Sequence, residues 1–322
     1  MKPAFSVIFL TTLIGAGQGL FLAIFTQQSY ALFGLLPLQN DAFYGFGSLL
    51  ALLFLIAGLA ASFFHLGHPE RAWRAASQWR TSWLSREVIV LPAFMGVVFL
   101  YGMSHLLAYR PVLVILPGKL PVDMSLILGG IGTLLAFILF VCTAMIYACL
   151  RLMREWHSPL TIANFILLGG ASGFTLAACY ATLAAPDQTG FFAGWAFIIT
   201  LLGLLSRSAA LWRNKRLRPV STIQSAVGIK HPRIVQRSQG FMGGSFNTRE
   251  FFHGKTAEFI RAIRPAFLAL AFGAPLLLLP LGTSAAVLLL AFLSQYLGLL
   301  AERWYFFAEA NHPQNLYYQT IG

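Results

Sequence analysis

Long apolar runs, almost free of charge, recur along the whole chain and constrain its fold more than any other feature. A helix of about 18 or more apolar residues is long enough to cross the hydrocarbon core of a bilayer. With 58% apolar and only 10% charged residues, residues 1–322 predict one all-α, polytopic integral membrane domain. The eight expected transmembrane helices are Ala4–Gln27, Phe43–Leu66, Arg86–Ala108, Asp123–Leu150, Pro159–Ala184, Phe191–Trp212, Pro265–Leu281 and Ser284–Phe306.

The basic residues gather on alternate connecting segments. Of the 22 Lys and Arg residues, all but Arg110 and Lys119 fall on the side of the membrane that would hold both termini. Because basic residues collect in cytoplasmic loops, this pattern predicts cytoplasmic termini and a multi-pass protein of the bacterial inner membrane. The net charge of +12 is thus a signal of topology, and no nucleic-acid-binding motif accompanies it.

The chain offers few ligands for a metal centre. Its cysteines, Cys142, Cys149 and Cys179, lie in apolar runs without a C-x-x-C spacing, so we expect no iron–sulfur cluster. A bis-histidine haem needs two histidines at matching depth. Only His65 and His105 lie in or near the spans, and they fall near opposite membrane faces, so we expect no haem either.

The segment between the second and third runs, FFHLGHPERAWRAASQWRTSWLSREV (63–88), concentrates polar residues. Gly67 and Pro69 predict that one helix ends there and that a short helix over Glu70–Trp79 follows along the membrane interface. The tryptophans of the segment are typical of that interface. Ser85 is the expected N-cap of the third span.

His65 and Glu87 end and begin consecutive spans, so their side chains would share one depth near the headgroups. Each has an ordinary structural explanation: a histidine can cap carbonyls, and a glutamate can complement a helix dipole. Beside Arg86 and Trp83, however, they would form a titratable pair able to bind a quinone headgroup, whose reduction or oxidation moves two protons. We expect His65 to transfer protons and Glu87 to be its partner or the exit for protons. Trp83, Arg86 and Gln18 would form the wall of the pocket.

Gln18 lies in the sequence Gly15-Ala16-Gly17-Gln18-Gly19 of the first run. Glycines permit close contact between membrane helices. The sequence leaves two roles open for the amide of Gln18: a hydrogen bond to another helix, or a hydrogen bond to a ligand deeper in the same cavity.

The longest polar stretch, residues 213–264, is too short to form an independent domain. Asn247 precedes Glu250 by three residues, the spacing of a capping box. An amphipathic helix is expected to follow, lying on the membrane surface or docking a partner. Its apolar face would consist of Phe252, Phe259, Ile260 and Ile263.

Two motifs carry a resemblance to a known family. HLGHPERAWRA (65–75) followed by SWLSREV (82–88) resembles the signature of the DmsC family, and GGSFNTREFFHG (243–254) looks like another of its motifs. These proteins are membrane anchors of DMSO-reductase-type molybdoenzyme complexes, related to the NrfD/PsrC family. The resemblance covers the whole chain and implies that His65 and Glu87 belong to a quinol site.

The resemblance also implies partners. A four-cluster ferredoxin-like iron–sulfur subunit and a molybdopterin catalytic subunit would dock on this chain, which would exchange electrons with ubiquinone or menaquinone. Arg71, Arg74 and Arg249 would dock the iron–sulfur subunit. Since the chain holds no molybdenum or cluster ligands, the substrate chemistry would lie in the other chains.

Within the family, the predicted cytoplasmic motif face, the chain length and the opening PAFSVIFLTTLIGAGQGLFLA (3–23) are similar to the SoeC-type anchors of cytoplasmic sulfite-oxidising complexes. Electrons would then run from sulfite to quinone. The alternatives are an anchor that oxidises quinol for a DMSO or polysulfide reductase, and a passive anchor with no quinone site. A transporter is a third class, but the spans lack the ionisable residues that line a transport path.

Overall fold

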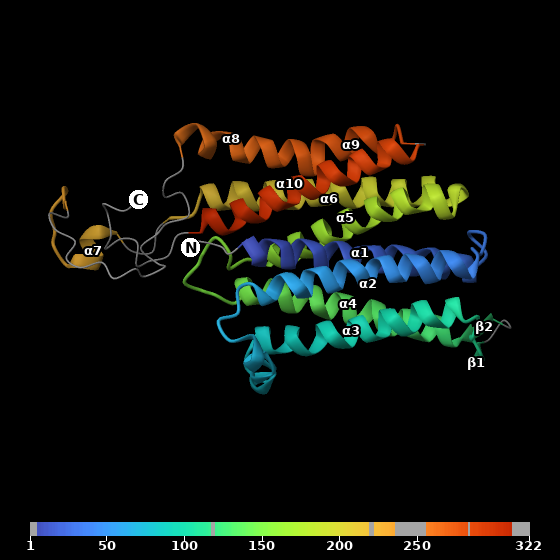
Figure 1. The fold of residues 1–322 in the computed structure, drawn as a ribbon. Helices are drawn as coiled ribbons and strands as arrows, with labels where there is room; N and C mark the ends of the chain where they lie inside the picture. The colour runs from blue at the N-terminus through green and yellow to red at the C-terminus, as the bar shows by residue number, and fades with distance from the viewer. Residues whose placement is uncertain (1–4, 117–119, 219–221, 236–255, 283, 311–322) are drawn as a thin grey trace.

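The protein is a bundle of eight helices of membrane-spanning length (Figure 1). The computed structural model describes residues 5–116, 120–218, 222–235, 256–282 and 284–310. Seven spans are single helices: α1 (Phe5–Leu32), α2 (Asp41–Phe63), α3 (Trp83–Leu106), α4 (Met124–Ala148), α5 (Pro159–Ala184), α6 (Thr189–Lys215) and α10 (Ala285–Glu309). The eighth, built from shorter pieces, is described below. The predicted all-α fold with eight spans is confirmed.

Short elements join the spans. They are the 3-10 helix η1 (Pro69–Gln78), the antiparallel strands β1 (Val112–Leu116) and β2 (Leu120–Asp123), the 3-10 helix η2 (Pro186–Gln188) and α7 (Ile223–Val227). Helix η1 stands where the short interfacial helix was predicted, whereas the hairpin was not predicted. The bundle end where α1 begins and α10 ends, called here the terminal end, also carries η1 and α7, and the hairpin lies at the opposite end (Figure 1).

The third span begins three residues earlier than the sequence suggested. Ser82 is its N-cap, with an extended backbone and a hydroxyl that accepts a hydrogen bond from the N–H of Ser85. The prediction of Ser85 as the cap was therefore wrong, because two serines at this spacing offer the same local chemistry. The shift places Glu87 in the second turn of α3 instead of the first.

The seventh span runs through a π-helical turn that α10 stabilises. It consists of α8 (Ala257–Leu268), the π-turn η4 (Ala269–Gly273) and α9 (Ala274–Leu278). A membrane interior demands partners for the carbonyls that such a turn frees. Ser294 donates a hydrogen bond to the carbonyl of Leu270 at 3.1 Å, and Gln295 donates to that of Ala271 at 3.5 Å.

The amphipathic helix predicted within residues 213–264 continues directly into this span. Thr256 caps α8, accepting a hydrogen bond from the N–H of Phe259. The expected capping pair Asn247 and Glu250 lies outside the described residues, as does Phe252.

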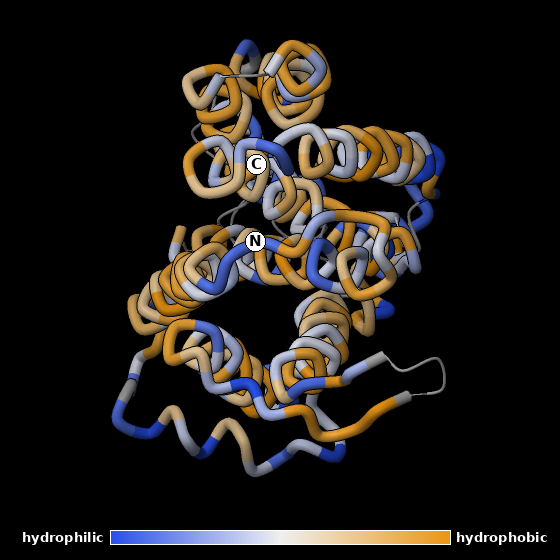
Figure 2. Tube along the Cα trace, turned by 90° about the vertical axis from the view of Figure 1, so that its right-hand side faces the viewer, coloured by the Kyte–Doolittle hydropathy of each residue, from blue (hydrophilic) through white to orange (hydrophobic). Residues whose placement is uncertain are grey.

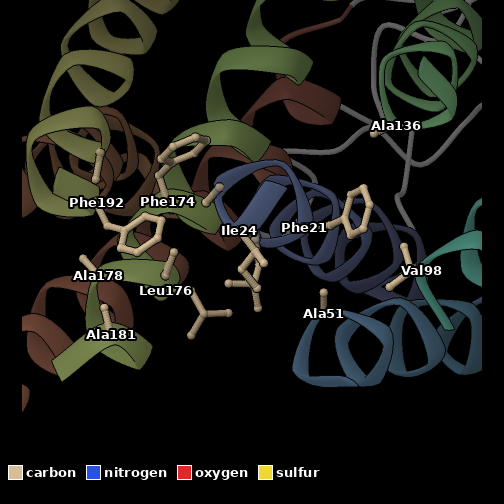
Figure 3. Close-up of a cluster of buried hydrophobic side chains, with 14 of the residues drawn as sticks. Phe21, Ile24, Ala51, Val98, Ala136, Phe174, Leu176, Ala178, Ala181 and Phe192 are labelled. Carbon is tan, nitrogen blue, oxygen red and sulfur yellow. The ribbon is translucent and has the colours of Figure 1, made fainter. Parts of the chain in front are cut away.

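Helices α1 and α5 form the centre of the bundle. Both are buried over 72% of their most apolar stretch, more than any other described span. Phe21 and Ile24 of α1 pack in one cluster with Phe174 of α5 and Phe192 of α6 (Figure 3). Seen end-on, the helices consist mainly of apolar residues, as expected of membrane spans, while many hydrophilic residues lie in the connecting segments (Figure 2).

Glycines let these two helices touch through their backbones. A Cβ atom on Gly19 would lie 2.3 Å from the carbonyl oxygen of Gly169, and one on Gly15 would lie 3.3 Å from the Cα of Gly169. The close helix contact predicted from the glycines around Gln18 is therefore present, between α1 and α5.

Replacing Gly173 with alanine is expected to destabilise the protein. The new Cβ would lie 2.1 Å from the carbonyl carbon of Gly19, so the helices must separate, at a cost of about 1–3 kcal/mol or more. A lower melting temperature of the purified protein in detergent would show this. Gly194→Ala on α6, where nothing lies within 4 Å, is the control. Equal melting temperatures for the two variants would contradict the expectation.

Candidate functional site

A polar recess lies inside the bundle, in its terminal-end half. Its walls come from five spans, α1, α3, α4, α5 and α10. Because α1, α3 and α5 begin at the terminal end, whereas α4 and α10 end there, the polar residues near those ends meet at similar depth. The polar residues that line the recess are Thr11, Thr12, Gln18, Glu87, Thr143, Ser172 and Arg303.

The recess is narrow in this structure. Its empty space totals about 430 Å³ when its open mouth is included, but the centre of a water molecule can occupy only about 20 Å³ of it. That is room for roughly one water molecule. A ring-sized ligand could enter only if the lining side chains moved apart.

Glu87 supplies an acidic group inside the bundle. Its side chain is buried, with only 7% of the residue exposed, and its Oε1 accepts a hydrogen bond of 2.5 Å from the hydroxyl of Thr143 on α4. No described cation forms an ion pair with it, and its second oxygen has no hydrogen bond to a described residue. A carboxyl group buried within a membrane span without an ion-pair partner is costly.

Gln18 joins Glu87 in the lining of the recess. Its Nε2 donates a hydrogen bond of 2.8 Å to the carbonyl of Ala136 on α4. The amide oxygen makes no hydrogen bond to a described residue. One half of the side chain thus holds two helices together, and the other half remains available to a ligand.

Trp83 and Arg86 line a different space, an apolar groove between α3 and α4 whose empty space totals about 660 Å³ when its open mouth is included. The Arg86 side chain donates hydrogen bonds to the carbonyls of Trp79 and Arg80 and lies 4.1 Å from the centre of the Trp83 ring. The rest of the groove consists of Val90, Phe137, Ile138, Val141 and Cys142.

The groove and the recess share one wall. Arg86 lines the groove and its neighbour Glu87 lines the recess; on α4, Cys142 lines the groove and Thr143 the recess. The Glu87–Thr143 hydrogen bond therefore joins α3 and α4 in the wall between the groove and the recess.

His65 lies in the turn after α2, exposed, at the terminal end of the bundle. Its side chain lines neither the recess nor the groove and makes no hydrogen bond to a described residue. The structure thus brings Gln18 and Glu87 together but records no contact between His65 and either of them. Partial burial lowers the pKa of His65 from its ordinary value of 6.5, so the neutral form of its imidazole predominates at pH 7.

Two of the three expected docking arginines lie in the described part of the chain. Arg71 and Arg74 are exposed on η1, where Arg71 pairs with Glu70 at 3.6 Å. Arg249 lies outside the described residues.

Comparison with known proteins agrees with this architecture. Residues 1–307 match the protein family described as DMSO reductase anchor subunit (DmsC). The chain belongs to the DmsC family. It is also 56% identical, over 325 aligned positions that cover 100% of both chains, to a protein of Allochromatium vinosum named as the C subunit of sulfite dehydrogenase. The resemblance inferred from the two motifs is therefore confirmed.

This DmsC-family chain also holds a buried charge cluster that sequence reasoning missed. The Nε of Arg207 on α6 lies 2.7 Å from Oε1 of Glu302 on α10, and its Nη2 lies 3.9 Å from Oε2 of Glu309. The Nε of Arg303 lies 3.4 Å from Oε2 of Glu302. From the sequence, both arginines were counted among the basic residues of the cytoplasmic side. The available signal was the spacing of Glu302 and Glu309, which puts two acids on one face of a membrane helix.

Proposed function

We propose that this chain is the quinone-reactive anchor of a membrane oxidoreductase complex. It passes electrons between a docked iron–sulfur subunit and the quinone pool, in the direction from sulfite oxidation to quinone. The observation that carries the proposal is the buried carboxyl of Glu87, which forms no ion pair with a described cation and shares a recess with Gln18. The 56% identity to the C subunit of a sulfite dehydrogenase supports the electron donor and the direction.

The chemistry of the recess suits a quinone. Reduction of a quinone takes up two electrons and two protons and turns each ring oxygen into a hydroxyl. The second oxygen of Glu87 can exchange a proton with such an oxygen, and the amide oxygen of Gln18 can accept a hydrogen bond from the hydroxyl that forms. Because the recess is narrow, the ring must displace the lining side chains as it binds.

The groove between α3 and α4 fits the rest of the molecule. Biological quinones carry a long apolar tail, and apart from Trp83 and Arg86 the groove is lined by aliphatic, phenyl and thiol side chains. It lies directly across the wall formed by Glu87 and Thr143. In this arrangement Trp83 and Arg86 bind the apolar tail of the quinone and not its ring.

His65 serves as the group that exchanges protons with water. It is exposed at the terminal end, and its lowered pKa keeps the imidazole neutral and able to accept a proton at pH 7. Protons would pass between His65 and Glu87 as the quinone reacts.

The partner subunits dock at the terminal end, on the cytoplasmic face of the inner membrane. The exposed arginines Arg71 and Arg74 lie on η1 at this end, and the charge pattern of the sequence predicts that Arg249 joins them. Positive surfaces attract and orient an acidic partner. The iron–sulfur subunit would bind there and hold the molybdopterin subunit, within electron-transfer reach of the recess.

The family match also favours a second candidate. An anchor of a DMSO-type reductase would use the same recess in reverse and oxidise quinol, since the direction depends on the catalytic subunit. A passive anchor is the remaining alternative, in which Glu87 has no part in turnover.

Replacing Glu87 with glutamine is expected to lower quinone-linked turnover of the complex in membranes by about 100-fold, because general acid–base catalysis contributes on that order. Dye-linked activity of the peripheral subunits should stay intact. Unchanged quinone-linked turnover in a correctly assembled complex would rule out this site and favour a passive anchor.

Replacing His65 with glutamine should lower the same turnover by about tenfold, less than the Glu87 change because His65 lies outside the recess. Quinone reduction consumes protons, so His65 must deliver them in its protonated form. Because its pKa is lowered from 6.5, wild-type turnover should fall as the pH rises above 6.5. The variant should lack this dependence on the protonation of His65. His68→Gln, at a neighbouring exposed histidine paired with Glu70, is the control and should behave as wild type; identical pH profiles for all three proteins would rule out a role for His65.

A further inference from the structure

The side chain of Arg303 closes the recess on the side of α10. Only 4% of the residue is exposed. Its guanidinium carbon lies 3.9 Å from the centre of the Phe165 ring, and its Nε lies 3.4 Å from Glu302. Its Nη1 is buried and has no hydrogen-bond partner among the described residues. A buried charged N–H without a partner is costly, so this group is suited to receive a ligand.

The surrounding charges do not require Arg303 to neutralise Glu87. The two positive charges of Arg207 and Arg303 balance the two negative charges of Glu302 and Glu309. Arg207 also lies closer to Glu302, at 2.7 Å, than Arg303 does. No ion pair between Arg303 and Glu87 occurs in the described part of the chain. The recess therefore presents a cation from α10 and a carboxyl group from α3 that are not paired with each other.

We propose that Arg303 donates a hydrogen bond to one oxygen of the quinone ring while the other oxygen meets Glu87. This inference rests on the proposed function and names a further binding residue for it. A para-quinone ring carries oxygen atoms at opposite ends, so it can contact the α3 side and the α10 side of the recess at once. An oxidised oxygen can only accept hydrogen bonds, which suits a guanidinium that can only donate.

Arg303 also acts on the electron step. Two electrons arrive from the docked iron–sulfur subunit, and negative charge builds on the ring oxygens before two protons from water neutralise it. A fixed cation beside one oxygen stabilises that charge without having to reorganise. Because arginine stays protonated in proteins, Arg303 contributes charge and a hydrogen bond, and the protons come through other groups.

The test replaces Arg303 with lysine in the assembled complex. Lysine keeps a positive charge beside Glu302 but loses the flat, forked donor that stacks on Phe165. The KM for the soluble quinone decylubiquinone should rise about tenfold, the loss expected for one charge-assisted hydrogen bond. The melting temperature and the dye-linked activity should stay close to wild type. Arg207→Lys is the matched control, because Arg207 also pairs with Glu302 but does not line the recess; its KM should be unchanged.

An unchanged KM in Arg303→Lys, or an equal rise in Arg207→Lys, would overturn the inference and leave Arg303 a structural residue. If the lysine variant does not assemble, the double variant Glu302→Gln with Arg303→Gln removes one charge of each sign, and the same rise in KM is expected of it. The proposed function is tested separately by Glu87→Gln. Normal quinone-linked turnover in that variant would contradict the proposed function, regardless of the result for Arg303→Lys.

Discussion

The backbone contact between α1 and α5 is the interaction on which the rest of this structure depends. Gly19 meets Gly169 and Gly173 with no side chain between the helices. This contact holds the two most buried of the described spans at the centre of the bundle and fixes the depth of Gln18 and Ser172 in the recess. A wider spacing would move these residues apart and open the site to lipid.

Around this centre, the buried Glu and Arg side chains of the described spans either form ion pairs or line the recess. In the buried cluster, the positive charges of Arg207 and Arg303 neutralise the negative charges of Glu302 and Glu309. Glu87 and Arg303 also retain atoms that face no described partner, on two walls of one space. In a low-dielectric interior such groups persist when function requires them, and a ligand with two oxygens would satisfy both.

The spans could be predicted from the sequence because length and lack of charge alone decide membrane insertion. Gln18 was found as a polar residue within an apolar run, and Glu87 as an acid at the start of a span within a motif of the family. Arg303 and Arg207 were not found, since an arginine near the end of a run is equally consistent with a surface position. Only the tertiary packing decides that they are buried: Phe267 of α8 and Tyr305 of α10 lie against Arg207, and Phe165 of α5 lies against Arg303. The cap at Ser82 and the hairpin were missed because local sequence offered several equivalent choices.

The central claim is that a quinone ring binds in the recess formed by α1, α3, α4, α5 and α10. Photoaffinity labelling of the complex with a photoreactive quinone, followed by mass spectrometry of the labelled peptides, tests it most directly. We expect labels on residues 11–18 of α1 and on the first turns of α3, both suppressed by excess quinone. Displaceable labels confined to other faces of the bundle, or found only on a partner protein, would contradict the claim.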